Sequence, residues 1–478
     1  MRAALYDLTA KRLDDTFVKN ERAVNFTDEG GAELDAEAAL AQVERAIADV
    51  FAKAGNHAAK IERVTASCFW HSLVGVDANG KALTPLLTWA DRRSAKYVET
   101  LQANFNESET HNRTGCRFHP SYWTAKLLWL REEQPEVFAR VEKWLTFGDF
   151  FALRFFGEAA TSVSQASGTG VFDVRRNDWD EEMIDFLGVR REQLPRIAGD
   201  EETFALKGAS TKLFQQLVDA KWYPAIGDGA ANNVGANCVE KTRAALMIGT
   251  SGAMRVIYAG EPPKKIPDGL WCYRLDRKRV IVGGALSDGG GLYRWLKDTL
   301  KLVETDDEIE KRIARNAPDC HGLTFLPFLA GERSTNWNAN ARGAILGLNQ
   351  NTSPVEITQA ALESIAYRFA AIFAELCAGV CDIKEIIASG GALRESPVWT
   401  QIICDTLNKP MFLPDEREAS SRGAVLYALE KAGIISNLSE ISSEKGQEFT
   451  PDSAKHEIYK EARQRQEKFH SIISKATE

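Results

Sequence analysis

A lone acid and a glycine-rich turn lie close together in the chain. The acid is Asp228, which stands between two glycines, and the turn is residues 249–252, with the sequence Gly-Thr-Ser-Gly. Because this turn has no bulky side chain, its backbone N–H groups and two hydroxyls can converge on a phosphate. A carboxylate held nearby can accept a proton from a hydroxyl that attacks this phosphate. The two features predict a phosphotransferase with Asp228 as the general base. The predicted phosphate cradle consists of Gly249, Thr250, Ser251 and Gly252.

A second group of reactive side chains occupies residues 88–93, where an aromatic ring, an acid and two guanidinium groups follow one another. An aromatic face can pack against the C–H groups of a sugar, and charged groups can bind its hydroxyls or a carboxylate. This pattern predicts a sugar site, and the alternative is a solvated helix start with Trp89 half buried. The two glycine-rich turns likewise have an alternative as ordinary loops, and the residues alone leave both open.

The composition is that of a globular protein and argues against several kinds of partner. The 478 residues are 44% hydrophobic and 26% charged, which suffices for two or more domains. A net charge of −8 without a basic block argues against nucleic acid or an anionic membrane as partner. The chain has neither a signal-peptide pattern nor an apolar run long enough to span a bilayer. Eight scattered cysteines fit a cytoplasmic location, and seven histidines without metal spacing predict no transition-metal site.

Two predicted strands lead into glycine-rich turns. The apolar residues 244–248 predict a buried strand that ends at the cradle, and residues 383–388 predict another that ends in the turn 389–392. A pattern of strand, loop and strand starts again after residue 240. We therefore expect a domain boundary there, which divides the chain into domains 1–240 and 241–478.

Four segments in this order resemble the FGGY carbohydrate kinases, within the sugar kinase/actin/Hsp70 superfamily. They are residues 226–229, 248–252, 326–333 and 389–392, with support from residues 342–348. One such turn is a weak signal, but the ordered set is highly specific and covers nearly the whole chain. The resemblance implies an α/β fold with two ribonuclease-H-like (actin-like ATPase) domains that flank a cleft. It also implies that the sugar binds mainly to the first domain and MgATP mainly to the second.

The resemblance also implies roles for individual residues. Asp228 matches the general base, and Thr250 with the backbone of residues 249–252 matches the groups that hold the phosphates. The positions where the family packs backbone against adenosine are Gly390, Gly391 and Ala392. The positions that match substrate contacts are His71, Trp89, Asp91 and Arg92. The implied cofactors are ATP and Mg²⁺, and the ion is held mostly by phosphates and water rather than by a dedicated protein site.

Within this family the chain looks most like the gluconate kinases. The residues 71–73, His-Ser-Leu, and 85–92, Pro-Leu-Leu-Thr-Trp-Ala-Asp-Arg, read like their substrate segment, whereas xylulose kinases tend to carry His-Gly and Trp-Asn-Asp. The expected reaction is ATP-dependent phosphorylation of D-gluconate to 6-phosphogluconate. The alternatives are a xylulose kinase or another FGGY sugar or polyol kinase, and a catalytically impaired, sugar-responsive regulator. A homodimer is one assembly that the sequence leaves open.

The front of the chain departs from the family pattern. The family opens with a strand and an acid followed by Gly-Thr-Thr or Gly-Thr-Ser, and then a segment that residues 2–7 match here. Residues 1–6 can also be aligned with residues 254–258, which directly follow the cradle. We therefore expect a first strand and a first phosphate loop to be missing ahead of Met1, which would leave neighbouring strand edges unpaired. An added upstream strand and loop are expected to raise kinase activity.

Overall fold

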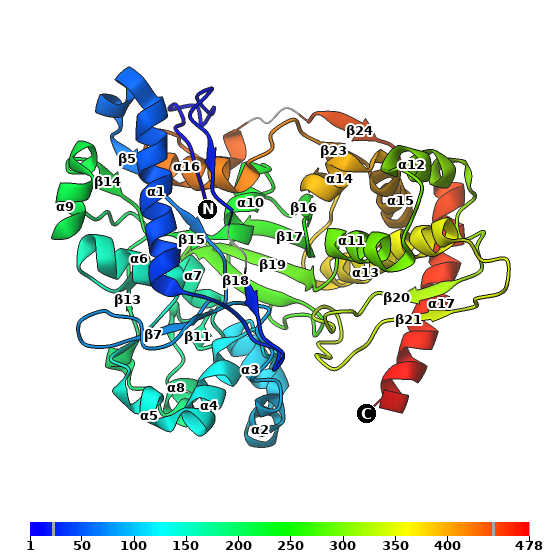
Figure 1. Ribbon diagram of the computed structural model, residues 1–478, viewed down its shortest axis with the longest axis horizontal. Helices are drawn as coiled ribbons and strands as arrows, with labels where there is room; N and C mark the ends of the chain where they lie inside the picture. The colour runs from blue at the N-terminus through cyan, green and yellow to red at the C-terminus, as the bar shows by residue number, and fades with distance from the viewer. Residues whose placement is uncertain (22–23, 442–444, 478) are drawn as a thin grey trace.

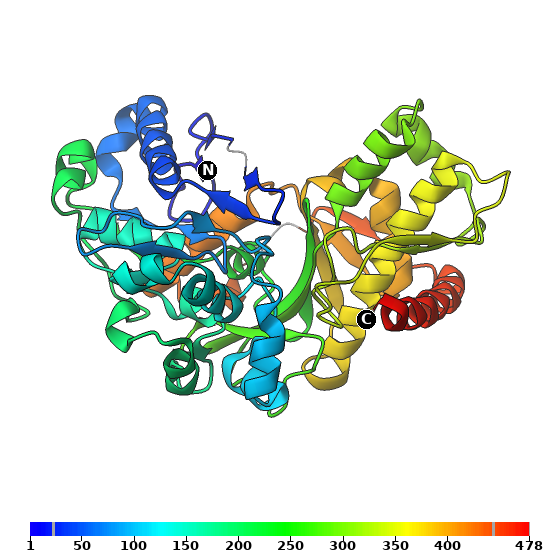
Figure 2. The same cartoon turned by 60° about the horizontal axis from the view of Figure 1, so that its bottom comes forward.

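Two α/β lobes lie side by side in the computed structural model (Figures 1 and 2). The structure describes residues 1–21, 24–441 and 445–477, the last three by their backbone alone. Helices and strands occur throughout both lobes, which confirms the expected α/β class. Among the described residues, no helix has both the length and the apolar character needed to cross a membrane.

The second lobe is organised around a seven-stranded sheet. Its central strand β16 (Arg243–Ile248) pairs antiparallel with β17 (Gly252–Ala259) and parallel with β22 (Glu385–Ser389). The order across the sheet is β18-β19-β17-β16-β22-β23-β24. Three antiparallel strands thus continue into the parallel strands β16, β22 and β23, as expected of a ribonuclease-H-like domain, and β24 is antiparallel at the edge. The other strands of this sheet are β18 (Trp271–Asp276), β19 (Arg279–Leu286), β23 (Met411–Leu413) and β24 (Gln447–Phe449).

Helix α13 (Pro354–Gly379) packs on this sheet at close range. It begins with a capping box, in which Ser353 Oγ accepts a hydrogen bond from the Glu356 N–H and the Glu356 carboxylate accepts one from the Ser353 N–H. A Cβ atom added at Gly252 would lie 2.7 Å from the Phe369 ring. Since a larger residue would push the helix away, the last glycine of the predicted cradle also sets the spacing between helix and sheet.

The first lobe contains short strands rather than one large sheet. Strand β1 (Arg2–Ala3) forms an antiparallel hairpin with β2 (Val18–Lys19). Two parallel pairs carry the chain towards Asp228: β5 (Arg63–Val64) with β14 (Lys221–Trp222), and β6 (Ser67–Cys68) with β15 (Ile226–Gly227). Within residues 1–21, 24–441 and 445–477, no strand joins the hairpin to these pairs in the way that β16 joins β17 to β22. The expected strand ahead of Met1 stays a prediction.

Further elements complete the two lobes around these sheets. The helices of the first lobe are α1 (Ala36–Ala54), α2 (Tyr97–Asn104), α3 (Glu107–Thr114), α4 (Trp123–Glu133), α5 (Pro135–Arg140), α6 (Phe147–Phe156), α7 (Val163–Ser167), α8 (Glu181–Leu187) and α9 (Ala209–Leu213). Its remaining strands are β3 (Asn25–Phe26), β4 (Ala32–Leu34), β7 (Val74–Val76), β8 (Leu86–Leu87), β9 (Lys143–Leu145), β10 (Ala160–Thr161), β11 (Phe172–Asp173), β12 (Asp178–Trp179) and β13 (Arg196–Ile197). The second lobe adds α11 (Gly290–Leu300), α12 (Asp306–Arg315), β20 (Thr324–Leu326), β21 (Ala344–Leu346), α14 (Gly391–Glu395), α15 (Pro397–Leu407) and α17 (Ser453–Thr477). Short 3₁₀ helices are η1 (Gly55–Lys60), η2 (Arg191–Gln193), η3 (Gln215–Leu217) and η4 (Leu438–Glu440).

Two helices cross at the junction of the lobes with their backbones in contact. Helix α10 (Asp228–Gly235), which begins at the predicted base, packs against α16 (Ala419–Lys431), and Figure 1 shows α16 next to the first lobe. A Cβ atom at Gly235 would lie 1.8 Å from the Ala419 carbonyl oxygen, and one at Gly423 would lie 1.8 Å from the Ala231 carbonyl oxygen. Glycine is therefore required at both positions because the helix backbones touch.

We expect Gly423→Ala to destabilise this crossing. The added methyl group must push α16 away from α10, and overpacking of this kind costs ~1–3 kcal/mol of the free energy of unfolding. Thermal unfolding followed by circular dichroism should show a lower midpoint. The control is Gly379→Ala at the end of α13, where the new Cβ would lie 3.5 Å from Pro267, an ordinary contact. Equal midpoints for the two variants would contradict the close crossing.

Candidate active site

Asp228 is the first residue of α10, directly after β15. The indole ring of Trp70 packs closely against this turn. A Cβ atom at Gly227 would lie 2.0 Å from the ring, and one at Gly229 would lie 2.5 Å from it. Trp70 is itself fixed by a hydrogen bond from its Nε1 to the Ser164 carbonyl oxygen at 2.8 Å. The two glycines around Asp228 are thus required by the close approach of Trp70, which determines the path of the backbone at the acid.

The Asp228 carboxyl group is partly buried, and burial raises its pKa above the usual value. The positive charge of Arg255 is the largest opposing influence, followed by a hydrogen bond from the Gly229 N–H to Oδ1 at 2.8 Å. The charge of Arg333 also lowers this pKa. The result is a carboxylate that is a stronger base than an exposed aspartate, while the charges of two guanidinium groups favour its ionised form.

Arg255 and Arg333 come from the second lobe, and neither is among the site residues predicted from the sequence. Arg255 lies on β17 and is 6% exposed, and its Nη1 has no hydrogen-bond partner in the described part of the chain. Burial lowers its pKa to about 10. The Arg333 guanidinium stacks over the Trp89 ring at 4.7 Å, and its Nη2 donates to the Leu286 carbonyl oxygen at 3.2 Å. The sequence does contain one sign of Arg255, since it is a charged residue within the apolar strand that follows the cradle.

His71 has a left-handed backbone conformation, with φ of 67°, and a buried imidazole. Its Nδ1 lies 2.5 Å from the Gly168 carbonyl oxygen, so Nδ1 carries the proton in this bond. Burial lowers the pKa of His71 to about 3, and the ring is neutral at physiological pH. The remaining nitrogen, Nε2, is then an acceptor that can bind a hydroxyl group. The Tyr122 and Tyr273 rings make T-shaped contacts with the imidazole, with 5.0 and 5.8 Å between ring centroids.

Trp89 and Arg92 reach the second lobe from the predicted sugar segment. Trp89 contacts Arg333 as described, and Arg92 Nη2 donates a hydrogen bond to the Ala339 carbonyl oxygen. Burial lowers the pKa of Arg92, and the positive charge of Arg342 lowers it further. No acid contributes to the pKa of Arg92 among the residues that the structure describes. An anion that binds next to Arg92 and Arg342 could therefore neutralise their two positive charges.

Asp91 is engaged in the fold of its own loop. Its Oδ2 accepts hydrogen bonds from the Ala32 N–H at 3.0 Å and from Arg93 Nη2 at 2.6 Å. Its Oδ1 accepts from the backbone N–H and the Nε of Arg93, both at 3.2 Å. Arg93 in turn bonds Glu33 at 2.6 Å. These bonds hold the sugar segment against β4, and a direct contact of Asp91 with a substrate stays a prediction.

Three glycine-rich turns meet where β16, β19 and β22 end. The cradle 249–252 follows β16, and the turn 389–392 begins at the last residue of the neighbouring parallel strand β22. A third turn, 289–291, binds the cradle directly, since the Gly290 N–H donates to the Gly249 carbonyl oxygen at 2.8 Å. The Gly291 N–H donates to the Thr250 carbonyl oxygen at 3.0 Å. The structure thus brings together the segments predicted to hold phosphates and adenosine.

Gly390 has a backbone conformation that only glycine adopts readily, with φ of 101° and ψ of 154°. A Cβ atom there would lie 2.1 Å from the Ile248 carbonyl oxygen, at the end of the strand that carries the cradle. Gly391 and Ala392 form the first turn of the short helix α14. A Cβ atom at Gly290 would in turn lie 3.1 Å from the Ala392 side chain. The three turns are therefore closely packed, and Gly290 and Gly390 have no room for a side chain.

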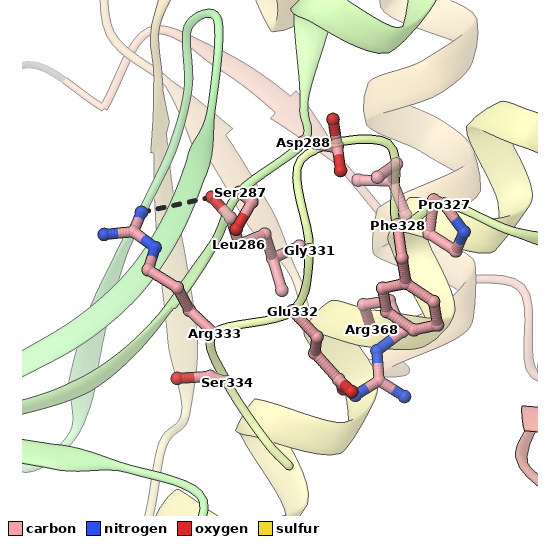
Figure 3. A pocket seen from close by; sticks show the side chains of 11 residues that line it. Leu286, Ser287, Asp288, Pro327, Phe328, Gly331, Glu332, Arg333, Ser334 and Arg368 are labelled. Atoms are coloured by element: carbon pink, nitrogen blue, oxygen red, sulfur yellow. Dashed lines mark hydrogen bonds and ion pairs between the residues drawn. The ribbon is translucent and has the colours of Figure 1, made fainter. Parts of the chain in front are cut away.

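A small cavity of about 10 Å³ lies at the end of β19 (Figure 3). Asp288, the residue before the third glycine turn, lines it together with Glu332 and Arg333. Burial raises the pKa of Asp288 to about 6, and its Oδ2 accepts a hydrogen bond from the Ala330 N–H at 3.3 Å. The charge of Arg333 lowers the pKa of Asp288 as well as that of Asp228. Arg333 is thus the cation shared by the predicted base and by an acid next to the cradle.

Another group of ligand-like side chains, Asp319, His321 and Glu363, lies apart from these turns. Arg465 on helix α17 forms hydrogen bonds with both carboxylate oxygens of Asp319, at 2.5 and 2.8 Å. Glu363 accepts hydrogen bonds from the hydroxyl of Tyr367 at 3.0 Å and from His321 Nε2 at 3.1 Å. Because these acceptors already have donors, the group serves to attach α17 to the second lobe.

Comparison with known proteins agrees with this architecture. Gluconokinase from Bacillus subtilis (strain 168) is 31% identical over 414 residues, which cover 83% of this chain and 80% of that protein. The structure of ligand-bound xylulose kinase from Lactobacillus acidophilus has a TM-score of 0.89 at 28% identity and covers 99% of this chain and 96% of that one. Gluconate kinase from Lactobacillus acidophilus has a TM-score of 0.88 at 27% identity, with 99% and 95% covered.

The family assignment follows from matches along most of the chain. Residues 1–216 match the N-terminal domain of the FGGY family of carbohydrate kinases, and residues 244–431 match its C-terminal domain. The two matches follow the order of the two lobes. Asp228 lies in the sequence between the matched ranges, and the glycine-rich turns lie in the second range. This chain therefore belongs to the FGGY family of carbohydrate kinases, which are phosphotransferases.

Proposed function

We propose that this chain transfers the γ-phosphate of MgATP to the terminal hydroxyl of D-gluconate and forms 6-phosphogluconate. The observation that carries the proposal is the placement of Asp228, at the junction of the lobes between two guanidinium groups. The similarity to gluconokinase from Bacillus subtilis supports gluconate as the substrate. We also propose the boundary between residues 240 and 241, with sugar binding in the first domain and nucleotide binding in the second.

In the proposed reaction Asp228 accepts the proton of the attacking hydroxyl. The hydroxyl oxygen forms a bond to the γ-phosphorus while the bond from this phosphorus to the β,γ-bridging oxygen breaks, and ADP leaves. The raised pKa of Asp228 suits this task, since a stronger base takes the proton more readily. The charges of Arg255 and Arg333 favour the ionised carboxylate before the transfer. The two positive charges thus favour the ionised form of the base and oppose the effect of burial.

The second domain would hold the nucleotide at its three glycine-rich turns. The backbone and hydroxyl of Thr250, with Gly249, Ser251 and Gly252, would bind the phosphates, and residues 390–392 would pack against adenosine. Mg²⁺ bound with ATP supplies charge neutralisation at the phosphates. The carboxylate of Asp288 offers an oxygen ligand of the kind that this ion prefers, either directly or through water.

The sugar would bind against the first domain. His71 Nε2 can accept a hydrogen bond from a hydroxyl, and the Trp89 ring can cover C–H groups. Arg92, next to Arg342, would neutralise the carboxylate at the far end of gluconate. This pair of charges supports an acid sugar over a neutral one, since without an anion the two guanidinium groups repel each other.

The test is a substrate panel with ADP release as the readout. D-Gluconate should give the largest kcat/KM among gluconate, D-xylulose and glycerol. The structural similarity to xylulose kinase, at a TM-score of 0.89, makes D-xylulose the most informative competitor. A larger kcat/KM for D-xylulose would replace gluconate in the proposal and leave the kinase chemistry in place. Sugar binding without any ADP release would instead point to a regulator.

We expect Arg92→Gln to act on the acid sugar specifically. Loss of a charge-assisted hydrogen bond, worth ~1.5–3 kcal/mol, should lower kcat/KM for gluconate by about 10- to 100-fold. The kcat/KM for a neutral sugar should change by less than about threefold, since no carboxylate is lost as a partner. Arg45→Gln on helix α1 is the control for loss of one positive charge. Equal losses on both sugars would count against a carboxylate contact at Arg92.

A further inference from the structure

A buried lysine is part of the first lobe, and the proposed chemistry does not use it. Lys126 lies on helix α4 and is 0% exposed. Its Nζ donates hydrogen bonds to the backbone carbonyl oxygens of His71, Thr88 and Ser121, each at 2.8 Å. Asp91 is the one acid whose charge acts on Nζ among the described residues, and its carboxylate bonds Ala32 and Arg93 instead. Since an ammonium group has three N–H donors, the three carbonyls use all of them.

Each of the three carbonyl groups belongs to a segment of the proposed sugar site. His71 is the residue that offers Nε2, and Thr88 directly precedes Trp89. The third carbonyl is that of Ser121, whose hydroxyl donates to the Trp89 carbonyl oxygen at 2.9 Å. The start of the same helix adds a fourth bond, from Trp123 Nε1 to the Ser72 carbonyl oxygen at 2.8 Å. The first turn of α4 therefore connects the segments that present the sugar-facing side chains.

We propose that Lys126 is a positioning residue that sets the shape of the sugar site by fixing His71 and Trp89 relative to each other. This inference rests on the proposed sugar kinase function. Lys126 does not touch the substrate, because its Nζ is enclosed by backbone carbonyl groups. It acts through the distance between the His71 imidazole, which accepts a hydroxyl, and the Trp89 ring, which covers the sugar.

The protonated form of Lys126 is the one that fits this task. Burial lowers its pKa to about 7, and the negative charge of Asp91 opposes this effect more than the positive charge of Arg93 adds to it. Three carbonyl oxygens pointing at Nζ further favour the ammonium form, because each accepts a hydrogen bond from it. A neutral side chain in this place would leave at least one buried carbonyl group without a donor, so the segments would move apart to reach water.

The first experiment compares Lys126→Met with the wild type. Methionine is similar in size but donates no hydrogen bond, so the three segments lose their common partner. We expect the KM for gluconate to rise at least tenfold, while the KM for ATP stays within twofold. A merely structural role would raise both values or only lower the unfolding midpoint. An unchanged KM for gluconate would overturn the inference.

A matched control lies on the same helix. Arg131 Nη1 also donates to a backbone carbonyl oxygen, that of Phe186 at 2.8 Å, on a segment outside the sugar site. Arg131→Met should therefore leave the KM for gluconate within twofold. If Lys126→Met fails to fold, Ser121→Ala is the milder variant, since it removes only the hydroxyl that bonds Trp89. It should also raise the KM for gluconate rather than that for ATP, and the reverse pattern would overturn the inference.

A second readout separates this inference from the proposed function. Hydrogen–deuterium exchange of the wild type and both methionine variants needs no sugar. Peptides covering residues 68–74 and 86–92 should exchange faster in Lys126→Met and at the wild-type rate in Arg131→Met. If the wild type phosphorylates no sugar but exchange changes in this way, the positioning role stands and the proposed substrate fails. Unchanged exchange in Lys126→Met would overturn the positioning role whatever the substrate.

Discussion

Asp228→Asn should lower kcat by ~10²–10⁴-fold, the usual contribution of a general base. The amide has the size of the carboxyl group, and its oxygen can still accept the hydrogen bond from the Gly229 N–H that holds Oδ1 at 2.8 Å. It cannot accept the proton of the sugar hydroxyl, so the attacking oxygen must lose its proton to water. Sugar and ATP affinities, measured by calorimetry, should change by less than about threefold.

The pH profile of kcat supplies a second measure of the same residue. The proposed base can work only when ionised, so kcat should fall as the pH drops through the pKa of Asp228. Because burial raises this pKa, the fall should begin at a higher pH than for an exposed aspartate. The charge of Arg255 opposes the rise in the pKa of Asp228. Arg255→Met should therefore move the acidic limb of the profile, which is the fall in kcat at low pH, to still higher pH. Asp228→Asn should remove this limb.

The control for Asp228→Asn is the same exchange at an exposed position of the first lobe, Asp185 on α8. Asp185→Asn should keep both kcat and the acidic limb. If Asp228→Asn retains kcat within about tenfold, less than a general base contributes, then Asp228 is not the base. A limb that does not move in Arg255→Met would show that Arg255 does not act on the carboxyl group.

Gly390→Ala is expected to have the second largest effect, on nucleotide binding. The backbone conformation at Gly390 is one that only glycine adopts readily, and a side chain there costs ~1–3 kcal/mol in strain alone. The new methyl group would also lie 2.1 Å from the Ile248 carbonyl oxygen and would displace the strand end that carries the cradle. At 1.4 kcal/mol for each factor of ten, MgATP affinity should fall by about 10- to 100-fold.

Calorimetric titration with ATP and with gluconate separates this effect from general damage. Gluconate affinity should stay near the wild-type value, since His71 and Trp89 lie in the other lobe. Gly322→Ala is the matched control, because Gly322 also has a positive φ, of 67°, but no atom lies within 4 Å of its added Cβ. Wild-type ATP affinity in Gly390→Ala would remove residues 390–392 from the nucleotide site.

Strands, turns and helix starts depend on residues that are close in the chain, so the sequence alone can predict them. An apolar run followed by Gly-Thr-Ser-Gly predicts β16 and its turn, and Ser353 with Glu356 predicts the start of α13. Strand periodicity, helix caps and turn residues act over a few positions, so a local pattern is enough to indicate them. The same holds for the ordered motifs, which indicate the FGGY family that the matches along the chain confirm.

The sequence by itself determined the family, the two-lobed α/β fold and the segments from which a site is built. Only the tertiary structure decided which side chains face one another across those segments. Arg255 acts on the charge of Asp228 from another lobe. Asp91 accepts hydrogen bonds from Ala32 and Arg93, and Lys126 donates hydrogen bonds to three carbonyl groups. Such contacts join residues far apart in the chain, and whether a buried charge is paired, desolvated or aimed at a ligand depends on packing that no local pattern records.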